Sequence, residues 1–276
     1  MNEKLGPGLY IVATPIGNLS DLSPHAASIL ANADLLAVED SRVTAKLLAH
    51  IGVKRPMTPY HDHNADRVRP GLIAQMADKA IALVSDAGTP LISDPGYKLV
   101  RGARAAGRYV TTAAGPSAAV AALTLSGLPT DRFLFIGFLP AKASARNTAI
   151  LEAAGVRATL LIYESASRLA VTLTALHELL GDRDAAVVRE ISKKFEECVA
   201  MDIGALAAHF AANPTKGEIV IVVGPPGPAR EPDEADVDAA LREAMRELSP
   251  SRAAAQVAED LGLPRRRVYE RALALR

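Results

Sequence analysis

A polar loop of twelve residues that directly follows an apolar run constrains the fold of this chain more than any other feature. The apolar run at 80–84 leads into Ser85–Gly96, which contains two glycines and two prolines, and a helical pattern follows from Tyr97. A plain strand-to-helix connection with a Ser or Asp cap is the alternative, but such connections usually need only about 2–6 residues. In open α/β sheets, ligands bind where loops leave the carboxyl ends of strands. The sequence therefore predicts a small-molecule site at this loop.

Residues 1–128 are expected to form an N-terminal α/β domain. Short apolar runs alternate there with helical patterns, and one helix begins at Ser23-Pro24 with a cap residue and a first-turn proline. Such alternation is typical of a parallel sheet with helices on both faces. The predicted strands lie at 9–13, 34–38, 80–85 and 109–112.

Residues 129–228 are expected to form a second α/β domain. Two of its predicted strands, 184–190 and 196–202, follow each other without a helix, so the sheet should be mixed or largely antiparallel. The run Pro225–Pro232 is rich in proline and predicts an extended linker. The other predicted strands lie at 133–139, 159–163 and 218–223.

Residues 229–276 are expected to form a small helical module. The segment 251–269 has the pattern helix, short glycine turn, helix, which is the spacing of a helix-turn-helix. From residue 251 to the end there are six arginines and three acidic residues, 6 − 3 = +3. Such a patch can guide phosphate groups, so we predict that RNA contacts Arg265, Arg266 and Arg267. A plain helical bundle with a solvated basic face is the alternative.

Composition excludes several classes of protein. Hydrophobic residues make up 49% of the 276, which excludes a disordered chain, and the formal net charge of zero argues against a charge-dominated nucleic-acid binder. No segment approaches the roughly 20 apolar residues of a membrane span, and the first residues lack the apolar stretch of a signal peptide. The single Cys198 cannot form an intramolecular disulfide, and we interpret it as a packing residue. A cytoplasmic protein is expected.

Two further turns should meet the loop at 85–96 on one edge of the first sheet. Segment 14–21 follows the first strand and segment 114–118 follows the strand at 109–112. The chain contains neither Gly-x-Gly-x-x-Gly nor a P-loop, and these turns carry few cations. A neutral or zwitterionic ligand is therefore favoured over a polyphosphate. The predicted contacts are Pro15, Gly17, Asp86, Ala87, Gly88, Pro90, Leu91, Gly115, Ser117 and Ala118.

The triplet His61-Asp62-His63 invites a metal interpretation. Two histidines beside an aspartate can chelate, but a transition-metal site usually needs a third or fourth ligand. No Cys or His cluster stands nearby in the sequence. We expect a polar turn and no metal site.

The chain resembles the S-adenosylmethionine-dependent tetrapyrrole methylase superfamily over about residues 8–224. Within it, the motifs are most similar to the bacterial 16S ribosomal RNA (cytidine-2′-O)-methyltransferases. One departure is visible, because that branch usually has Glu-Ser-Pro-His-Arg where this chain has Glu-Ser-Ala-Ser-Arg at 164–168. The motifs that carry the resemblance are Thr14–Asp21, Val38–Arg42, Ser85–Gly96, Gly115–Ala118, Tyr163–Ser165 and Arg189–Glu197.

The resemblance implies a function and a set of partners. It implies two α/β domains with the methyl donor, S-adenosylmethionine, in the cleft between them and with Tyr163 among the donor contacts. It also implies a homodimer that methylates a ribose hydroxyl of 16S ribosomal RNA in the 30S subunit. The departure at 164–168 removes the histidine that this motif usually provides, although the turn itself can survive.

The implied reaction needs groups that act on a ribose hydroxyl. Attack on a sulfonium methyl needs no metal, but a base or a positive charge that stabilises the alkoxide would help. The candidates for such groups are Glu39 and Asp40, at the end of a predicted strand, and the charge run at 193–197. Within that run, Lys193 and Lys194 are the candidates for the positive charge, with Glu196 or Glu39 to orient them. The alternatives are a helix cap at Asp40 and a solvated charge run at 193–197. Two arginines can hold phosphates bidentately, Arg42 and Arg189.

Two other classes of function fit parts of the sequence. A methyltransferase for a porphyrin-like ring would share the donor pocket, yet it has no need of Glu39–Arg42 or of a basic C-terminal module. A non-catalytic ligand sensor that binds RNA or DNA would also have a pocket and a helix-turn-helix. Transfer of labelled methyl groups to 30S particles separates that sensor from the enzyme.

Overall fold

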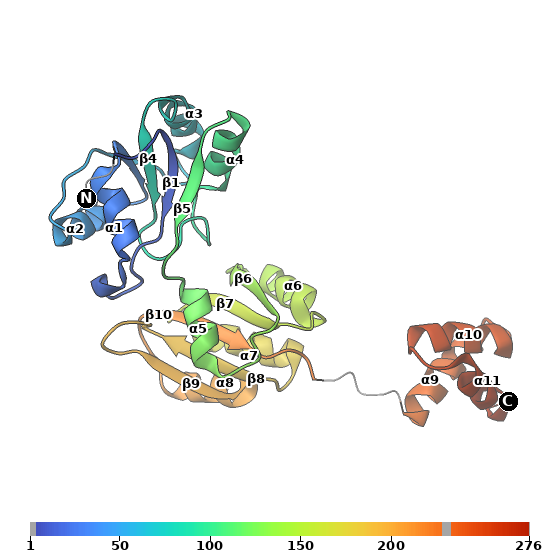
Figure 1. The fold of residues 1–276 in the computed structure, drawn as a ribbon. Helices are drawn as coiled ribbons and strands as arrows, with labels where there is room; N and C mark the ends of the chain where they lie inside the picture. The colour runs from blue at the N-terminus through green and yellow to red at the C-terminus, as the bar shows by residue number, and fades with distance from the viewer. Residues whose placement is uncertain (1–3, 228–232, 276) are drawn as a thin grey trace. The chain divides into compact units, whose positions relative to one another are not determined.

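The computed structural model describes residues 4–227 and 233–275. The chain divides into two compact units, Met1–Pro226 and Gly227–Arg276, and each is a separate body (Figure 1). Most of the linker predicted at 225–232, as well as Arg276, lies outside the described residues.

The first sheet of the larger unit is entirely parallel. Its strands are ordered β3-β2-β4-β1-β5, and every pairing between neighbours is parallel, which confirms the prediction. Strand β3 was not predicted, because it has only three residues and ends in a proline. The strands are β1 (Gly8–Val12), β2 (Leu35–Val38), β3 (Met57–Pro59), β4 (Ala80–Val84) and β5 (Val110–Ala113).

Helices cover both faces of this sheet because apolar residues occupy alternating sides of its strands. In β4, Ala80, Ala82 and Val84 pack toward α1 (Pro24–Asn32) and α2 (Ser41–His50). Ile81 and Leu83 pack toward the opposite face, where α3 (Ala65–Gln75) and α4 (Tyr97–Ala105) lie. Helix α1 begins as predicted, since the Ser23 hydroxyl accepts the Ala26 N–H at 3.0 Å.

The second sheet is mixed, as predicted. Strands β6 and β7 are parallel and the remaining pairs are antiparallel, in the order β6-β7-β10-β8-β9. The strands are β6 (Phe133–Phe138), β7 (Thr159–Ser165), β8 (Asp184–Arg189), β9 (Glu197–Asp202) and β10 (Glu218–Val223).

This sheet also has helices on both faces. Helix α5 (Ala118–Ser126) packs on one face, against residues such as Val220 and Val222, and Figure 1 shows it crossing the sheet. Helices α6 (Ala143–Ala154), α7 (Leu169–Leu180) and α8 (Ile203–Ala212) pack on the other. Helix α5 thus precedes residue 128 but belongs by packing to the second sheet. The division into domains 1–128 and 129–228 stays a prediction.

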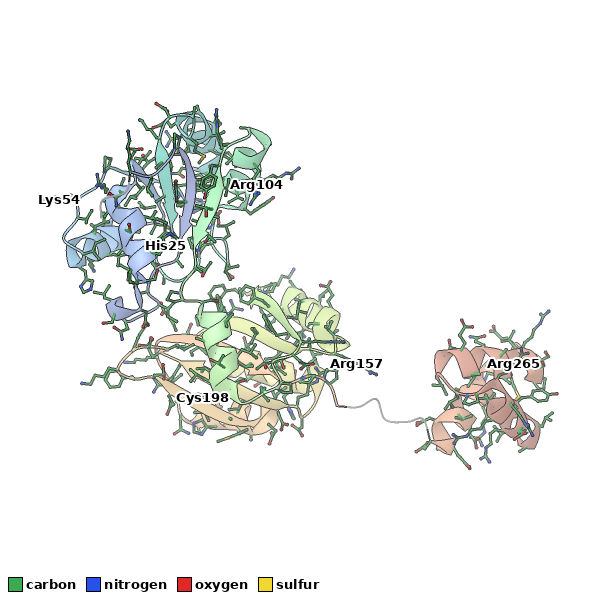
Figure 2. The ribbon with its side chains drawn as sticks, in the orientation of Figure 1. His25, Lys54, Arg104, Arg157, Cys198 and Arg265 are labelled. Atoms are coloured by element: carbon green, nitrogen blue, oxygen red, sulfur yellow. The ribbon has the colours of Figure 1, made fainter. Side chains whose placement is uncertain are left out.

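Cys198 is exposed, so its interpretation as a packing residue is wrong. It lies on β9, which is an edge strand of the second sheet, and its thiol is 3.4 Å from the carbonyl oxygen of Leu125 (labelled in Figure 2). An edge strand pairs on one side only, and the residues of β9 are mostly exposed.

The smaller unit has three helices within its described residues, α9 (Glu234–Ala244), α10 (Pro250–Asp260) and α11 (Arg265–Ala274). Leu241, Ala254 and Val268 form its core. Arg271 also donates from Nη2 to Asp238 Oδ2 at 2.7 Å, which ties α11 to α9. A short turn between α10 and α11 completes the predicted helix-turn-helix pattern. No helix in the described parts of the chain is long and apolar enough to cross a membrane.

Candidate functional site

The pocket loop, residues 85–96, lies at a topological switch point of the first sheet. Strands β1 and β4 are neighbours, yet α1 packs on one face of the sheet and α4 on the other. The segments that leave these two strands therefore diverge, which opens a crevice at their carboxyl ends. At its base Thr14 and Gly88 exchange two backbone hydrogen bonds, of 2.9 and 3.0 Å.

A cavity of about 430 Å³ lies at this crevice. Its size falls within the range of about 300–1,000 Å³ that is usual for small-molecule sites. One wall comes from residues that follow strands of the first sheet, including Ile16, Glu39, Asp86, Asp94 and Ser117. The other wall comes from the second sheet and includes Phe138, Tyr163, Glu164, Ile191 and Glu218.

The structure brings six of the eleven predicted donor contacts to this cavity. They are Asp86, Ala87, Gly88, Ser117, Ala118 and Tyr163, and Glu39, which was predicted as a catalytic residue, lines the cavity as well. Five others lie outside the lining, and their role in binding stays a prediction: Pro15, Gly17, Pro90, Leu91 and Gly115.

The backbone of the pocket loop is held in an uncommon conformation. Leu91 and Ser93 have φ angles of 76° and 65°, in the left-handed region that residues with side chains rarely adopt. Gly88 has a φ of 75°, and a Cβ there would come within 3.3 Å of Ile16 Cγ2, which follows β1 in the same wall. Strain of this kind persists only where the surroundings enforce it, which is common at binding sites.

Carboxylates make one side of the cavity negative. Burial, followed by the charge of Glu39, raises the pKa of Asp94 to about 6. Burial, followed by the charge of Asp86, likewise raises the pKa of Glu39. Asp86 accepts the backbone N–H of Asp40 at 3.0 Å, which joins the ends of β4 and β2. A cation bound here would relieve the repulsion between these groups.

Tyr163 and Glu164 shape the wall that the second sheet provides. The Tyr163 hydroxyl accepts the backbone N–H of Ala119 at 3.2 Å. Glu164 is buried, accepts the Thr172 hydroxyl at 2.7 Å and lies 3.4 Å from Arg168 Nε. Arg168 donates in turn to the Leu139 carbonyl at 2.7 Å. The turn at 164–168 thus forms with Ala166 and Ser167 at its centre.

A second turn with left-handed backbone, at Glu190 (φ 51°) and Ser192 (φ 64°), adjoins this wall and contains Lys193. Its ammonium contacts Glu190 at 2.9 Å and Glu218 at 2.7 Å, and Glu218 lines the cavity. Burial alone would lower the pKa of Lys193, but hydrogen bonds to Glu190 and Glu218 outweigh it, so the pKa is raised. Lys193 therefore stays charged and is better suited to stabilise an anion than to act as a base.

The neighbours of Lys193 have other partners. Glu196 accepts the backbone N–H of Ser192 at 2.6 Å, so it holds the turn, while Glu190 and Glu218 orient the lysine. Lys194 is exposed and lies over the ring of Phe195, with Nζ 5.6 Å from the ring centre. The catalytic roles of Glu196 and Lys194 stay predictions.

The two arginines predicted to hold phosphates already have carboxylate partners. Arg42 pairs with Asp40, whose carboxylate also caps α2 by accepting the Arg42 N–H at 2.8 Å. The hydrogen bonds from Arg42 lower the pKa of Asp40 to about 2. Arg189 pairs with Glu197 at 2.6 Å. A phosphate would have to compete with these carboxylates.

His61-Asp62-His63 forms a polar turn ahead of α3. The His61 N–H donates to the Asn64 side chain at 3.0 Å, and Asn64 donates to the Pro59 carbonyl at 3.0 Å. Within residues 4–227 and 233–275, no three His, Cys, Asp or Glu side chains are grouped closely enough to hold a metal ion.

Several lining residues were not singled out from the sequence. Asp94 belongs to the predicted loop but was not picked out within it. Phe138 and Glu218 carry no local motif and reach the cavity only because β6 and β10 end and begin at that edge of the second sheet. Such residues can be found only once the strand order is known.

Comparison with known proteins identifies the family of this chain. A model for tetrapyrrole (corrin/porphyrin) methylases matches residues 8–207, and a model for the RsmI C-terminal HTH domain matches residues 231–276. The uroporphyrin-III C-methyltransferase of Thermus thermophilus, solved in complex with S-adenyl homocysteine, has a similar fold. Its TM-score is 0.56 at 18% identity, over 79% of this chain and 97% of that one.

Two curated relatives match almost the whole chain. The ribosomal RNA small subunit methyltransferase I of Erythrobacter litoralis is 52% identical over 274 residues, which are 99% of this chain and 97% of that protein. The protein of the same name from Mesorhizobium japonicum is 48% identical over 277 residues, with coverages of 99% and 94%. The chain therefore belongs to the ribosomal RNA small subunit methyltransferase I family, on a tetrapyrrole methylase fold.

Proposed function

We propose that this protein transfers a methyl group from S-adenosylmethionine to the ribose 2′-hydroxyl of a cytidine in 16S ribosomal RNA. The observation that carries the proposal is the acidic cavity at the switch point, in a chain 52% identical to a ribosomal RNA methyltransferase. Because its substrate would be a small ribosomal subunit, we place the protein in the cytoplasm.

The residues of the cavity fit S-adenosylmethionine. This donor carries a sulfonium and an ammonium group, and Glu39, Asp86 and Asp94 offer negative charge to either. Ile16, Ile191 and Val220 offer apolar surface to its remaining parts. The relative from Thermus thermophilus was solved with the demethylated form of the same molecule, which supports this assignment.

The chain supplies charge and a proton acceptor to the reaction. When bound, S-adenosylmethionine supplies an electrophilic methyl group. A ribose hydroxyl that accepts it must lose a proton, and Glu39 is our candidate to take it, because its raised pKa makes it a better base than a free carboxylate. Lys193, held near the cavity by Glu218, would stabilise the developing alkoxide.

The C-terminal module is our candidate for a second contact with RNA. Helix α11 carries four arginines and one glutamate, 4 − 1 = +3, and helix α9 carries four acidic residues and one arginine, 1 − 4 = −3. Arg265 and Arg267 form no ion pair within the described part of the module, whereas Arg266 pairs with Glu270 at 3.0 Å. The first turn of α11, which carries Arg265 and Arg267, would therefore approach phosphates.

We further propose that the protein acts as a homodimer. Val120 and Leu125 on α5 and Met201 on β9 are exposed apolar side chains that a second copy could cover. Light scattering at micromolar concentration measures this, and a strict monomer would contradict it.

Methyl transfer itself is tested with a tritiated donor. Small subunits isolated from cells that lack this protein should gain label in their 16S RNA when it is added, at the 2′-oxygen of one cytidine. Wild-type small subunits, already methylated, serve as the control. Absence of label from the RNA, or label on a base, would refute the proposal.

Gly88→Val should weaken binding of S-adenosylmethionine by about tenfold, because the added side chain would crowd Ile16 and occupy space in the cavity that the donor needs. Calorimetry with the folded variant measures this. Gly107→Val is the matched control, since Gly107 also has positive φ but meets no atom within 4 Å. If the two variants bind S-adenosylmethionine with equal affinity, the donor does not bind beside Gly88.

A chain that ends at Pro226 should still bind the donor but lose roughly tenfold in affinity for small subunits at low salt. Phosphate contacts release counterions, so the difference should shrink as salt rises. Filter binding across a salt series measures it. If the shortened chain methylates at the full rate with unchanged affinity, the module has only a structural role.

A further inference from the structure

Phe138 is a large apolar side chain left largely in water at the edge of the cavity. It lines the cavity and is nevertheless 60% exposed. Other aromatic side chains are as exposed, but Phe138 also lines the cavity, so its ring is free to contact a molecule that binds there.

The local backbone of β6 determines the position of the Phe138 ring. Strand β6 has an irregular register against β7 between Phe135 and Gly137, which is where a β-bulge redirects the residues that follow. Gly137 has a φ of 75°, and a Cβ there would lie 3.1 Å from the Ser93 hydroxyl of the pocket loop. Phe138 is therefore placed beside the pocket loop by a specific local geometry.

The ring is supported on one side and open on another. It packs edge-to-face on Tyr163, with centroids 5.5 Å apart, and Tyr163 is fixed by its hydrogen bond to Ala119. The next residues are also fixed, because Arg168 donates to the carbonyls of Leu139 and Pro140 at 2.7 and 3.3 Å. A supported, exposed ring of this kind suits a flat partner such as a nucleobase.

Two cations follow the ring at the start of α6. Lys142 is exposed and Arg146 is half-buried, and neither forms an ion pair with any described residue. The Nε atom of Arg146 is buried without a hydrogen-bond partner. Four residues span at most about 14 Å, so Lys142 lies within one nucleotide or two of the Phe138 ring. The cavity is acidic, whereas Lys142 and Arg146 make the start of α6 positive.

We propose that Phe138 is the platform on which the base of the acceptor nucleotide stacks, and that Lys142 and Arg146 hold the phosphates beside it. This rests on the proposed function and adds to it the site for the RNA. Stacking uses the face of the base and needs it to be unpaired, so the substrate at this point is single-stranded RNA. Phe138 is thus a residue that binds substrate, distinct from those that bind the donor.

The ring is tested by three substitutions with small subunits from cells that lack this protein. Phe138→Ala should lower kcat/KM for the particles about 10- to 100-fold, the range for loss of one base stack. Phe138→Leu should lose nearly as much, whereas Phe138→Tyr should stay close to wild type, because it keeps the ring. Phe133→Ala is the matched control, since Phe133 is 48% exposed on the same strand but does not line the cavity.

Donor affinity, measured by calorimetry in each variant, separates the outcomes. Unchanged donor affinity with lost particle activity supports the proposal. If Phe138→Ala loses donor affinity and activity equally, the ring serves the donor, and if Phe138→Leu matches wild type, the ring does not stack; either result overturns it. Should the wild-type protein itself bind no donor or transfer no methyl group, the proposed function fails instead.

The cations are tested by salt dependence. Lys142→Ala and Arg146→Ala should each reduce the slope of log affinity against log salt by about one, the loss of one phosphate contact. Lys54→Ala, at another exposed lysine of the same unit, should leave the slope unchanged. Unchanged slopes in both the Lys142→Ala and the Arg146→Ala variant would show that the phosphates lie elsewhere.

Discussion

Lys193→Ala is expected to slow methyl transfer by about a hundredfold or more while changing donor affinity little, which is the usual scale for one group that stabilises an oxyanion. The Lys193 ammonium is shared by Glu190 and Glu218, and these two contacts keep it protonated. Its stem lies against Gly17, so the side chain has little freedom to move. A fixed positive charge near the cavity stabilises a developing alkoxide without any rearrangement.

Single-turnover methylation of small subunits measures this effect. Lys193→Arg keeps the charge and should recover much of the rate, whereas Lys193→Met keeps the stem only and should not. Lys194→Ala, which removes a lysine that only covers Phe195, should cost far less. Near-normal rates in both alanine variants would exclude the two lysines and leave Glu39 and Asp40 as the candidate catalytic groups.

Removal of Lys193 also leaves Glu190 and Glu218 without their shared cation, so a loss of structure must be separated from a loss of chemistry. Ser192 on the same turn donates to Asp21 at 2.7 Å and fastens the turn to the first half of the unit. Ser192→Ala removes that contact and keeps the charge. If it slows transfer as much as Lys193→Ala, the turn acts through its position and the ammonium has no special role.

The parallel sheet was predictable from the sequence because both of its faces are buried. Strand β4 is apolar at all five positions, and a run like this between helical patterns allows few other folds. Strand β3 gave no such signal. It has three residues with no fully buried position, and its pairing with β2 rather than its own pattern makes it a strand.

The site was predictable only in its loops. The pocket loop can be recognised by its length and by its glycines and prolines. From the sequence it was placed at the carboxyl end of a strand, and the structure confirms this, because it follows β4. The partners of Lys193 could not be predicted, because Glu218 lies 25 positions away and meets it only through the pairing of β10 with β8. Charge runs show which groups are present, but strand order decides which of them meet.

Asp94→Asn is expected to weaken binding of S-adenosylmethionine by about 10- to 150-fold at pH 7.5, the range for loss of one interaction with a charged group. Asp94 lines the cavity beside Glu39, and its pKa of about 6 means that it is mostly ionised at this pH. As pH falls through about 6, protonation should weaken donor binding in the wild-type protein. The same pH change should have a smaller effect in the variant.

Asp94→Asn should raise the stability of the fold at pH 7.5, although it weakens donor binding. The pKa of Asp94 is raised from 3.8 to about 6, so the folded protein binds this proton more tightly than the unfolded chain does. Its contribution to stability is present below about 3.8 and is lost as pH rises through about 6, where burying the charge becomes costly. Asp94→Asn removes that cost and should raise the melting temperature at pH 7.5. A variant that binds the donor poorly and melts higher would assign Asp94 to function, whereas a variant that loses both would make the carboxylate part of the fold.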